Sequence, residues 1–260
     1  MKMDYIRFIY LPVLVLFQVS IVLGQNSGFL SQQKKYPRVR TALAEKEAVI
    51  KMKLESLQIH NTNINIYIRI FKMERILQLW VKKTTVDTFA LLANYDFCTS
   101  SGDLGPKRHQ GDLQIPEGFY YIDRFNPGSI FYLSLGINYP NASDRIFNNA
   151  NPGGDIFIHG NCVTLGCVPI TDDKIKELYL YAVYAKNAGQ KKIPVHIFPY
   201  RFNDQNSSRK VRQNASYSVY SEFWNNLKEG YDRFEKGHRL PKITIDKRDG
   251  KYLLSYNTNY

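Results

Sequence analysis

The stretch GDIFIHGNCVTLGCVPITDD, residues 154–173, gathers the residue types of this chain that are best suited to chemistry. His159, Cys162 and Cys167 fall within nine positions, and Cys98 is the remaining cysteine of the chain. Three interpretations fit this cluster: a metal site, a structural cysteine pair, or nucleophilic catalysis by a thiol. Each makes a different demand on the surrounding chain.

A metal site is the weakest of the three interpretations. A structural zinc normally takes four ligands, and His159, Cys162 and Cys167 provide three. Cys98 completes the set only if the fold brings it near, and no paired C-x-x-C or H-x-x-x-H spacing is present. We therefore expect neither a metal nor another cofactor.

The structural interpretation treats the cysteines as small buried side chains or as a disulfide. Cys162 could pair with Cys98, or instead with Cys167, which would remove Cys167 from any chemistry. Because the chain has three cysteines, one thiol must stay unpaired within it. An unpaired cysteine in an exported protein is a candidate reactive thiol.

The catalytic interpretation needs a base that lowers the cost of forming a thiolate. His159 ends a strand-like run and could serve as that base, if the loop after it folds the Cys167 thiol back. Gly160 and Gly166 allow the tight turns that such a loop requires. The backbone N–H groups of Gly166 and Cys167 could then face an oxyanion.

The elements that must position these residues follow from periodicity and turn formers. An amphipathic helix is expected over residues 38–58, and Thr171 is expected to cap a helix that ends at Gly189. Residues 101–120 are too rich in glycine and proline for regular structure, and a loop is expected over 201–216. Strands are expected within 64–83 (two), 88–98, 129–140, 154–160 and 193–200, a helix over 221–236, and a hairpin over 242–256.

The N-terminus and the net charge bear on location and partners. Lys2 and Arg7 precede an apolar run of about 17 residues, with small residues near Gly24, a signal-peptide layout. An uncleaved anchor is the alternative, since a spanning helix usually needs about 20 residues. The net charge of +12 is spread along the chain, and no nucleic-acid-binding motif accompanies it, so we expect no nucleic-acid partner.

Three segments occur in an order and spacing that resemble a known family. GPKRHQGDLQIPEGFYYI, SLGINYPN and IFIHGNCVTLGCVPITDD together resemble the L,D-transpeptidase (YkuD-type) catalytic domain of bacterial cell-wall enzymes. The likeness is to the murein L,D-transpeptidase subgroup, whose motif is His-Gly, a short loop, then Ser/Thr-x-Gly-Cys. FWNNLKEGYDRFE resembles the C-terminal helix of that subgroup.

This resemblance implies a fold and a set of roles. The fold is mainly β with flanking helices (α+β): an L,D-transpeptidase-like β-sandwich core with a C-terminal helix and hairpin. Cys167 is the implied nucleophile and His159 the base, oriented by a backbone carbonyl. Gly160, Gly166 and Thr164 are implied to position the loop and the oxyanion.

The resemblance also implies where substrate binds, with two departures from the family pattern. Residues 105–118 match the region leading to the cleft, where Lys107 and Arg108 would meet substrate carboxylates; solvated surface charge is an equally good account of both. Leu165 and Pro169 stand where the broader family often has His and Arg, which leaves the substrate open.

The implied reaction takes place on peptidoglycan stem peptides in the periplasm or cell envelope, with a thioester on Cys167. An amine of another stem or of a wall-linked protein resolves it; hydrolysis by water and a non-catalytic wall-binding module are alternatives. The oligomeric state is unknown from sequence. We expect a signal peptide over 1–24, an N-terminal helical segment over 25–60, the catalytic domain over 61–200, and the C-terminal helix and hairpin over 201–260.

Overall fold

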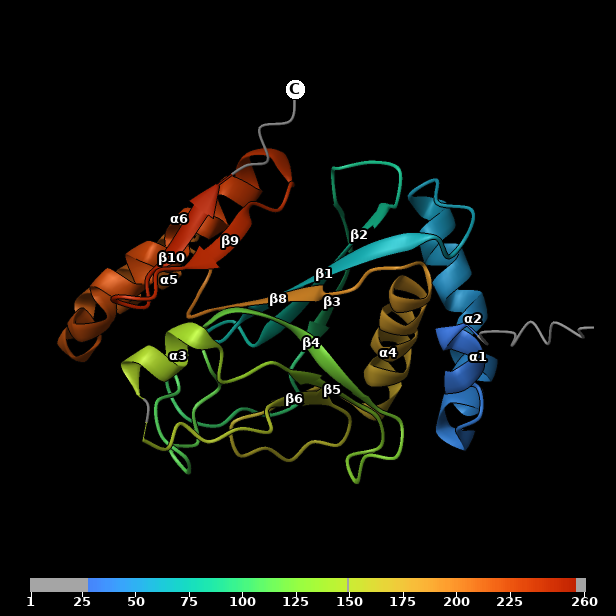
Figure 1. The fold of residues 1–260 in the computed structure, drawn as a ribbon, viewed down its shortest axis with the longest axis horizontal. Coiled ribbons are helices and arrows are strands. Elements are labelled where there is room, and N and C mark those ends of the chain that lie inside the picture. Colours follow the sequence, from blue (N-terminus) through green and yellow to red (C-terminus); the bar gives the residue numbers. More distant parts are fainter. Residues whose placement is uncertain (1–27, 149, 256–260) are drawn as a thin grey trace, which may run out of the picture.

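A computed structural model describes residues 28–148 and 150–255, so the expected signal peptide lies outside the described residues. Figure 1 shows one large curled sheet with helices on both sides, which confirms the expected α+β class. The helices are α1 Phe29–Gln33, α2 Pro37–Ser56, α3 Ala142–Phe147, α4 Asp172–Asn187, α5 Gln205–Gln213, the 3₁₀ helix η1 Ala215–Tyr220 and α6 Ser221–Gly237. The strands are β1 Ile64–Phe71, β2 Ile76–Lys83, β3 Ala90–Asp96, β4 Gly118–Asn126, β5 Ser134–Ile137, β6 Phe157–His159, β7 Val168–Pro169, β8 Ile193–Phe198, β9 Lys242–Ile245 and β10 Tyr252–Ser255.

The large sheet has eight strands in the order β3-β2-β1-β8-β4-β5-β6-β7, and β9 and β10 form a separate hairpin. Most neighbours are antiparallel, but β8 runs parallel to β1 and β7 runs parallel to β6. These two parallel pairs need crossovers, and α4 provides part of the connection between β7 and β8. The short strands β6 and β7 therefore form one edge of the sheet, and they carry the His-Cys cluster.

One face of the sheet packs on α4, which in turn packs on α2 and α1 (Figure 1). Alternate residues of β1, such as Ile66 and Ile68, point into this core, as strand geometry requires. The helix α4 begins as expected, because the Thr171 side chain accepts a hydrogen bond from the Lys174 N–H. Its first turn directly follows β7, so the helix fixes the end of the cysteine loop.

The opposite face of the sheet is covered in part by α6 and the β9–β10 hairpin (Figure 1). Polar contacts tie α6 to the sheet: Arg69 of β1 bonds Glu235 of α6 at 2.5 Å, and Glu117, just before β4, is paired with the buried Lys72 at 3.0 Å. Glu117 also accepts from the Trp224 indole N–H at 2.7 Å. The C-terminal segment consequently packs on the same body that carries the cluster, and the expected terminal helix and hairpin are confirmed.

The prediction of a loop over residues 201–216 is wrong. The structure has α5 there, capped by the Asp204 side chain, which accepts from the Ser207 N–H, and then η1. The segment is so polar that its periodicity is weak, and Val211 is its buried apolar anchor. The sequence also did not indicate α1, α3 or β4.

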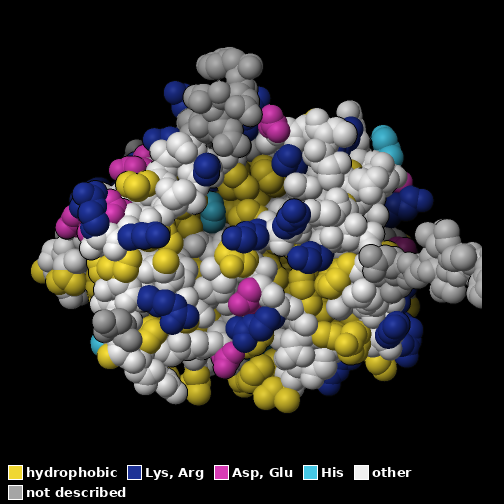
Figure 2. Space-filling view, viewed as in Figure 1, with side chains coloured by type: hydrophobic (Ala, Val, Ile, Leu, Met, Phe, Trp, Pro, Cys, Tyr) yellow, Lys and Arg dark blue, Asp and Glu magenta, His cyan; other side chains and the backbone are white. Residues whose placement is uncertain are grey.

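The described residues contain no helix that is both long enough and apolar enough to cross a bilayer. On the face seen in Figure 2, Lys and Arg side chains are scattered among other residue types instead of forming one basic patch. The positive charge is therefore distributed on this face, as it is along the sequence.

Candidate active site

His159 is the last residue of β6 and its imidazole is almost fully buried, at 1% exposure. The ring stacks on Phe131, with centroids 4.6 Å apart, and Nδ1 lies 2.5 Å from the Gly160 carbonyl oxygen. Because a carbonyl only accepts, Nδ1 must carry the proton, and Nε2 is left as the basic nitrogen. Burial lowers the pKa of His159, and the bond to Gly160 offsets part of that shift.

The register of β6 and β7 places Cys167 on the same side of the sheet as His159. Ile158 pairs with Val168, and both side chains belong to the core on the α4 face. Since side chains alternate along a strand, His159 projects to the other face, and so does Cys167, which directly precedes β7. The strand register therefore places the two residues on one sheet face, although they are eight positions apart in sequence.

The Cys167 sulfur is held by two backbone groups. It accepts a hydrogen bond from the Phe157 N–H at 3.4 Å, and it donates to the Asp155 carbonyl oxygen at 3.7 Å. Burial raises the pKa of the thiol, and the Asp155 charge raises it further, whereas the Phe157 N–H and Lys107 lower it. Together with the lowered pKa of His159, these shifts favour a resting pair of neutral thiol and neutral imidazole.

The loop between the two strands is fixed at its last turn. Gly166 has φ of +100°, a left-handed conformation that favours glycine. The Thr164 hydroxyl accepts from the Cys167 N–H at 2.9 Å and donates to the Cys167 carbonyl at 2.8 Å. The Gly166 N–H donates to the Ser101 hydroxyl at 2.7 Å, so both N–H groups expected at an oxyanion are bonded to hydroxyls here.

Cys98 and Cys162 form a disulfide with their Cα atoms 5.5 Å apart, and Cys167 is a free thiol. The structural interpretation of Cys98 and Cys162 is thus confirmed, and the bridge between Cys162 and Cys167 that the sequence allowed is absent. The disulfide between Cys98 and Cys162 links the end of β3 to the loop after His159. Among residues 28–148 and 150–255, no group of three or more His, Cys, Asp or Glu side chains is arranged to hold a metal.

A pocket of about 630 Å³ is lined in part by Asp155, whose carbonyl bonds the Cys167 sulfur, and by Leu165; Cys167 and His159 themselves do not line it. Lys107 also lines this pocket, but its ammonium is buried and donates to the Asp112 carboxylate at 2.6 Å. Arg145, which the sequence did not single out, lines the same pocket from α3. The pocket therefore presents the exposed Arg145 guanidinium and the exposed Asp155 carboxylate to a ligand, whereas the Lys107 charge is buried and already paired with Asp112.

Arg108 lies apart from this pocket. Its guanidinium is 3.3 Å from Asp144 and lies over the rings of Phe147 and Phe223, at 4.5 and 5.3 Å. These contacts hold α3 and α6 against the loop that contains Lys107. The Arg108 side chain thus packs between α3 and α6. Of Lys107 and Arg108, only Lys107 lines the pocket.

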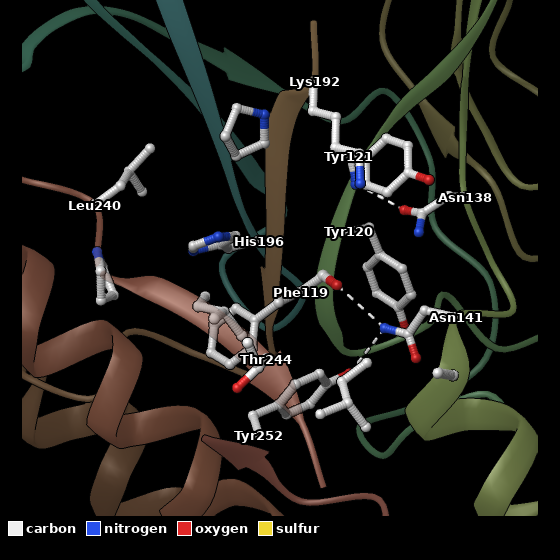
Figure 3. Close-up of a pocket in the computed structure, with 15 residues that line it drawn as sticks. Phe119, Tyr120, Tyr121, Asn138, Asn141, Lys192, His196, Leu240, Thr244 and Tyr252 are labelled. Carbon is white, nitrogen blue, oxygen red and sulfur yellow. Dashed lines mark hydrogen bonds between the residues drawn. The ribbon is translucent and has the colours of Figure 1, made fainter. Parts of the chain in front are cut away.

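A different pocket, of about 430 Å³, lies between the β9–β10 hairpin and strands β4 and β8 (Figure 3). Asn141 in its wall is bonded to the Phe119 carbonyl and the Tyr252 hydroxyl. His196 in its floor bonds the Tyr67 hydroxyl at 2.7 Å, and burial and Arg69 lower the pKa of His196 well below the usual value. No thiol lines this pocket, so it offers no counterpart to the His159–Cys167 pair.

Two comparisons by sequence agree on one family. The profile of the L,D-transpeptidase catalytic domain (YkuD) matches residues 65–197, which include His159 and Cys167. Over 192 residues the chain is 39% identical to "Putative L,D-transpeptidase YafK" of Escherichia coli K12, covering 73% of this chain and 74% of that protein. The protein of the same name from E. coli O157:H7 matches to the same extent.

Solved structures of low sequence identity also match. The helical cell shape determining protein Pgp2 of Campylobacter jejuni has a TM-score of 0.41 and 17% identity, covering 71% of this chain and 73% of that one. Bd1075 of Bdellovibrio bacteriovorus has a TM-score of 0.38 and 20% identity, covering 74% and 77%. On the sequence comparisons, this chain belongs to the L,D-transpeptidase (YkuD) family.

Proposed function

We propose that the protein is a cysteine-dependent L,D-transpeptidase that acts on peptidoglycan stem peptides in the cell envelope. The observation that carries this proposal is the position of Cys167, a free thiol on the same sheet face as His159. The hydrogen bond from Nδ1 to Gly160 supports a role of His159 as base, because it leaves Nε2 to accept the thiol proton.

The proposed reaction begins when Nε2 of His159 takes the proton of the Cys167 thiol as sulfur attacks the amide carbonyl between diaminopimelate and D-alanine. A C–S bond forms, the C–N bond breaks, and His159 returns the proton to the departing amine of D-alanine. The amine of another stem, or of a wall-linked protein, then attacks the thioester and restores the thiol. If water attacks instead, the product is the trimmed stem.

The loop residues support this chemistry through the backbone. Thr164 holds the Cys167 peptide from both sides, which fixes the direction of the sulfur. In the proposed tetrahedral intermediate, the oxyanion replaces the Ser101 hydroxyl as the acceptor of the Gly166 N–H. We propose that Lys107 and Arg145 attract the carboxylates of the stem, and that Arg108 serves the same end indirectly by holding this region in place.

The organisation of the chain is part of the proposal. A signal peptide over residues 1–24 would deliver the protein to the envelope, and residues 61–200 would form the catalytic domain. The segment 25–60 and the segment 201–260 would then pack on that domain as helical and hairpin additions.

One incubation tests the proposed function. Purified tetrapeptide stems are mixed with the protein and the products are identified by mass spectrometry, with the Cys167→Ala variant as control. Cross-linked dimers with release of D-alanine support transpeptidation, and tripeptides alone support the hydrolytic alternative. Absence of any product from the wild-type protein, with or without an added amine acceptor, would overturn the proposal.

A further inference from the structure

Arg124 lies on β4, two strands away from β6 and on the same sheet face as the candidate nucleophile Cys167. It occupies β4 opposite Gly136 of β5, and Gly136 in turn pairs with Phe157 of β6. A register shift between Ile122 and Arg124 marks a bulge there, which turns the Arg124 side chain across the sheet. The side chain is 44% exposed, so solvent and ligands can reach it.

The absence of a side chain at Gly136 makes this crossing possible. A Cβ atom at Gly136 would lie 2.9 Å from Arg124 Nε and 3.0 Å from the Phe157 ring. Over the glycine, the guanidinium carbon comes to 4.9 Å from the centre of the Phe157 ring. A guanidinium over an aromatic face is held in orientation while its N–H groups stay available at its edge.

Arg124 contacts the side chains of both residues whose backbone groups bond the Cys167 sulfur. Its guanidinium lies over Phe157, and NH1 is 2.7 Å from the Asp155 carboxylate. The Phe157 N–H and the Asp155 carbonyl are the two partners of the thiol, at 3.4 and 3.7 Å. A single residue, Phe157 or Asp155, therefore links the Arg124 guanidinium to the Cys167 sulfur.

Arg124 is paired with two carboxylates, with Asp155 through NH1 at 2.7 Å and with Asp123 through Nε at 3.1 Å. The pair with Asp155 is of a kind that a ligand can replace. The Asp155 side chain is 81% exposed, and an exposed ion pair contributes little to stability. Arginine binds carboxylates through paired N–H groups better than any other side chain. A carboxylate of the substrate can thus take the place of Asp155 without leaving a buried charge unpaired.

We propose that Arg124 forms a carboxylate subsite beside Cys167, which selects acyl donors that carry a free carboxylate close to the scissile amide. In the resting protein Asp155 occupies this subsite and is displaced by the donor. This proposal rests on the proposed function in its choice of donor, but the subsite itself is a property of the thiol's surroundings and can be tested without turnover.

The test compares alkylation of Cys167 by iodoacetate and by iodoacetamide. Both reagents form a C–S bond with the thiolate and release iodide, but only iodoacetate carries a carboxylate. The ratio of the two rates cancels the thiolate fraction and leaves the preference for negative charge. We expect Arg124→Gln to lower this ratio about three- to fivefold, the range for one partly exposed ion pair, and Asp155→Asn to raise it.

A matched control is Arg248→Gln, which removes another exposed arginine that is paired with an aspartate, Asp246, on the distant hairpin. Its rate ratio should equal that of the wild type. The proposal is overturned if Arg124→Gln leaves the ratio unchanged, or if Arg248→Gln lowers it equally, because general surface charge would then explain the effect.

Turnover provides a second readout that separates this proposal from the proposed function. With a stem donor, Arg124→Gln should raise KM at least threefold for the free acid and leave KM for its C-terminal carboxamide unchanged. If the wild-type protein turns over no stem donor but the alkylation ratio still responds to Arg124, the proposed function fails and the subsite stands. If wild-type turnover is normal and neither readout responds, the subsite fails alone.

Discussion

The disulfide between Cys98 and Cys162 is expected to make a large contribution to stability, because it closes a loop whose ends are 64 residues apart. In the chain-entropy description, a bridge that closes a loop of this length stabilises the native state by about 4 kcal/mol at 25 °C. The Cys98 N–H also donates to the Pro169 carbonyl at 3.2 Å, so the bridge joins the ends of β3 and β7 as well as the loop after His159.

Replacement of both Cys98 and Cys162 by serine removes the bridge without leaving a new free thiol. We expect the free energy of unfolding to fall by about 4 kcal/mol, measured by urea denaturation with circular dichroism. For a chain of this size, that loss corresponds to a decrease in Tm of about 8–16 °C. We also expect faster alkylation of Cys167 by iodoacetamide, since the loop that shields it loses its tether.

Dithiothreitol provides the control. It should destabilise the wild-type protein to the level of the double variant and leave the double variant unaffected. A loss below about 1 kcal/mol in the double variant would refute the reasoning, because the loop-closure effect for this separation is several times larger. Three reactive thiols per native molecule before reduction would contradict the pairing itself.

Cys167→Ala should abolish turnover and leave Tm within about 2 °C, since a thiol that is not in a bridge holds little of the fold. Because the pKa of the thiol is raised and the pKa of His159 is lowered, alkylation of Cys167 by iodoacetamide should keep rising above pH 9; a plateau below pH 7 would show a resting ion pair instead. His159→Ala should reduce kcat at least 100-fold, as loss of a general base does, with little change in that alkylation profile. Glu117→Ala should destabilise the protein by about 3–5 kcal/mol in urea, because Lys72 keeps an uncompensated buried charge, whereas the exposed Glu222→Ala should cost under about 1 kcal/mol.

The sequence by itself determined the local parts of the candidate site. His159 and Cys167 are eight positions apart, and a strand, a glycine turn and a second strand can bring such residues together in few ways. Thr171 and the apolar stripe after it indicated α4, because capping and periodicity act within one or two turns of chain. The odd number of cysteines required one unpaired thiol, although not its identity.

Tertiary structure decided what depends on distant segments meeting. Arg124 reaches Asp155 only because the sheet order places β4, β5 and β6 side by side. Ser101 reaches the Gly166 N–H because the loop after β3 lies against the loop after β6, where the Cys98–Cys162 disulfide joins them. Local periodicity contains no information about which strands pair, so neither residue could be singled out from sequence.

The same reason explains why Lys107 and Arg108, which are adjacent in sequence, have different surroundings. A sequence motif can single out both Lys107 and Arg108, because they are adjacent. Their side chains nevertheless point in different directions from the backbone and contact different residues. Arg108 meets Asp144 and the aromatic rings of α3 and α6, whereas Lys107 faces the pocket. The sequence indicates which chemically reactive residues are present. Which side chains lie at the candidate site is decided by the packing of distant segments, since their contacts depend on the whole sheet and not on spacing along the chain.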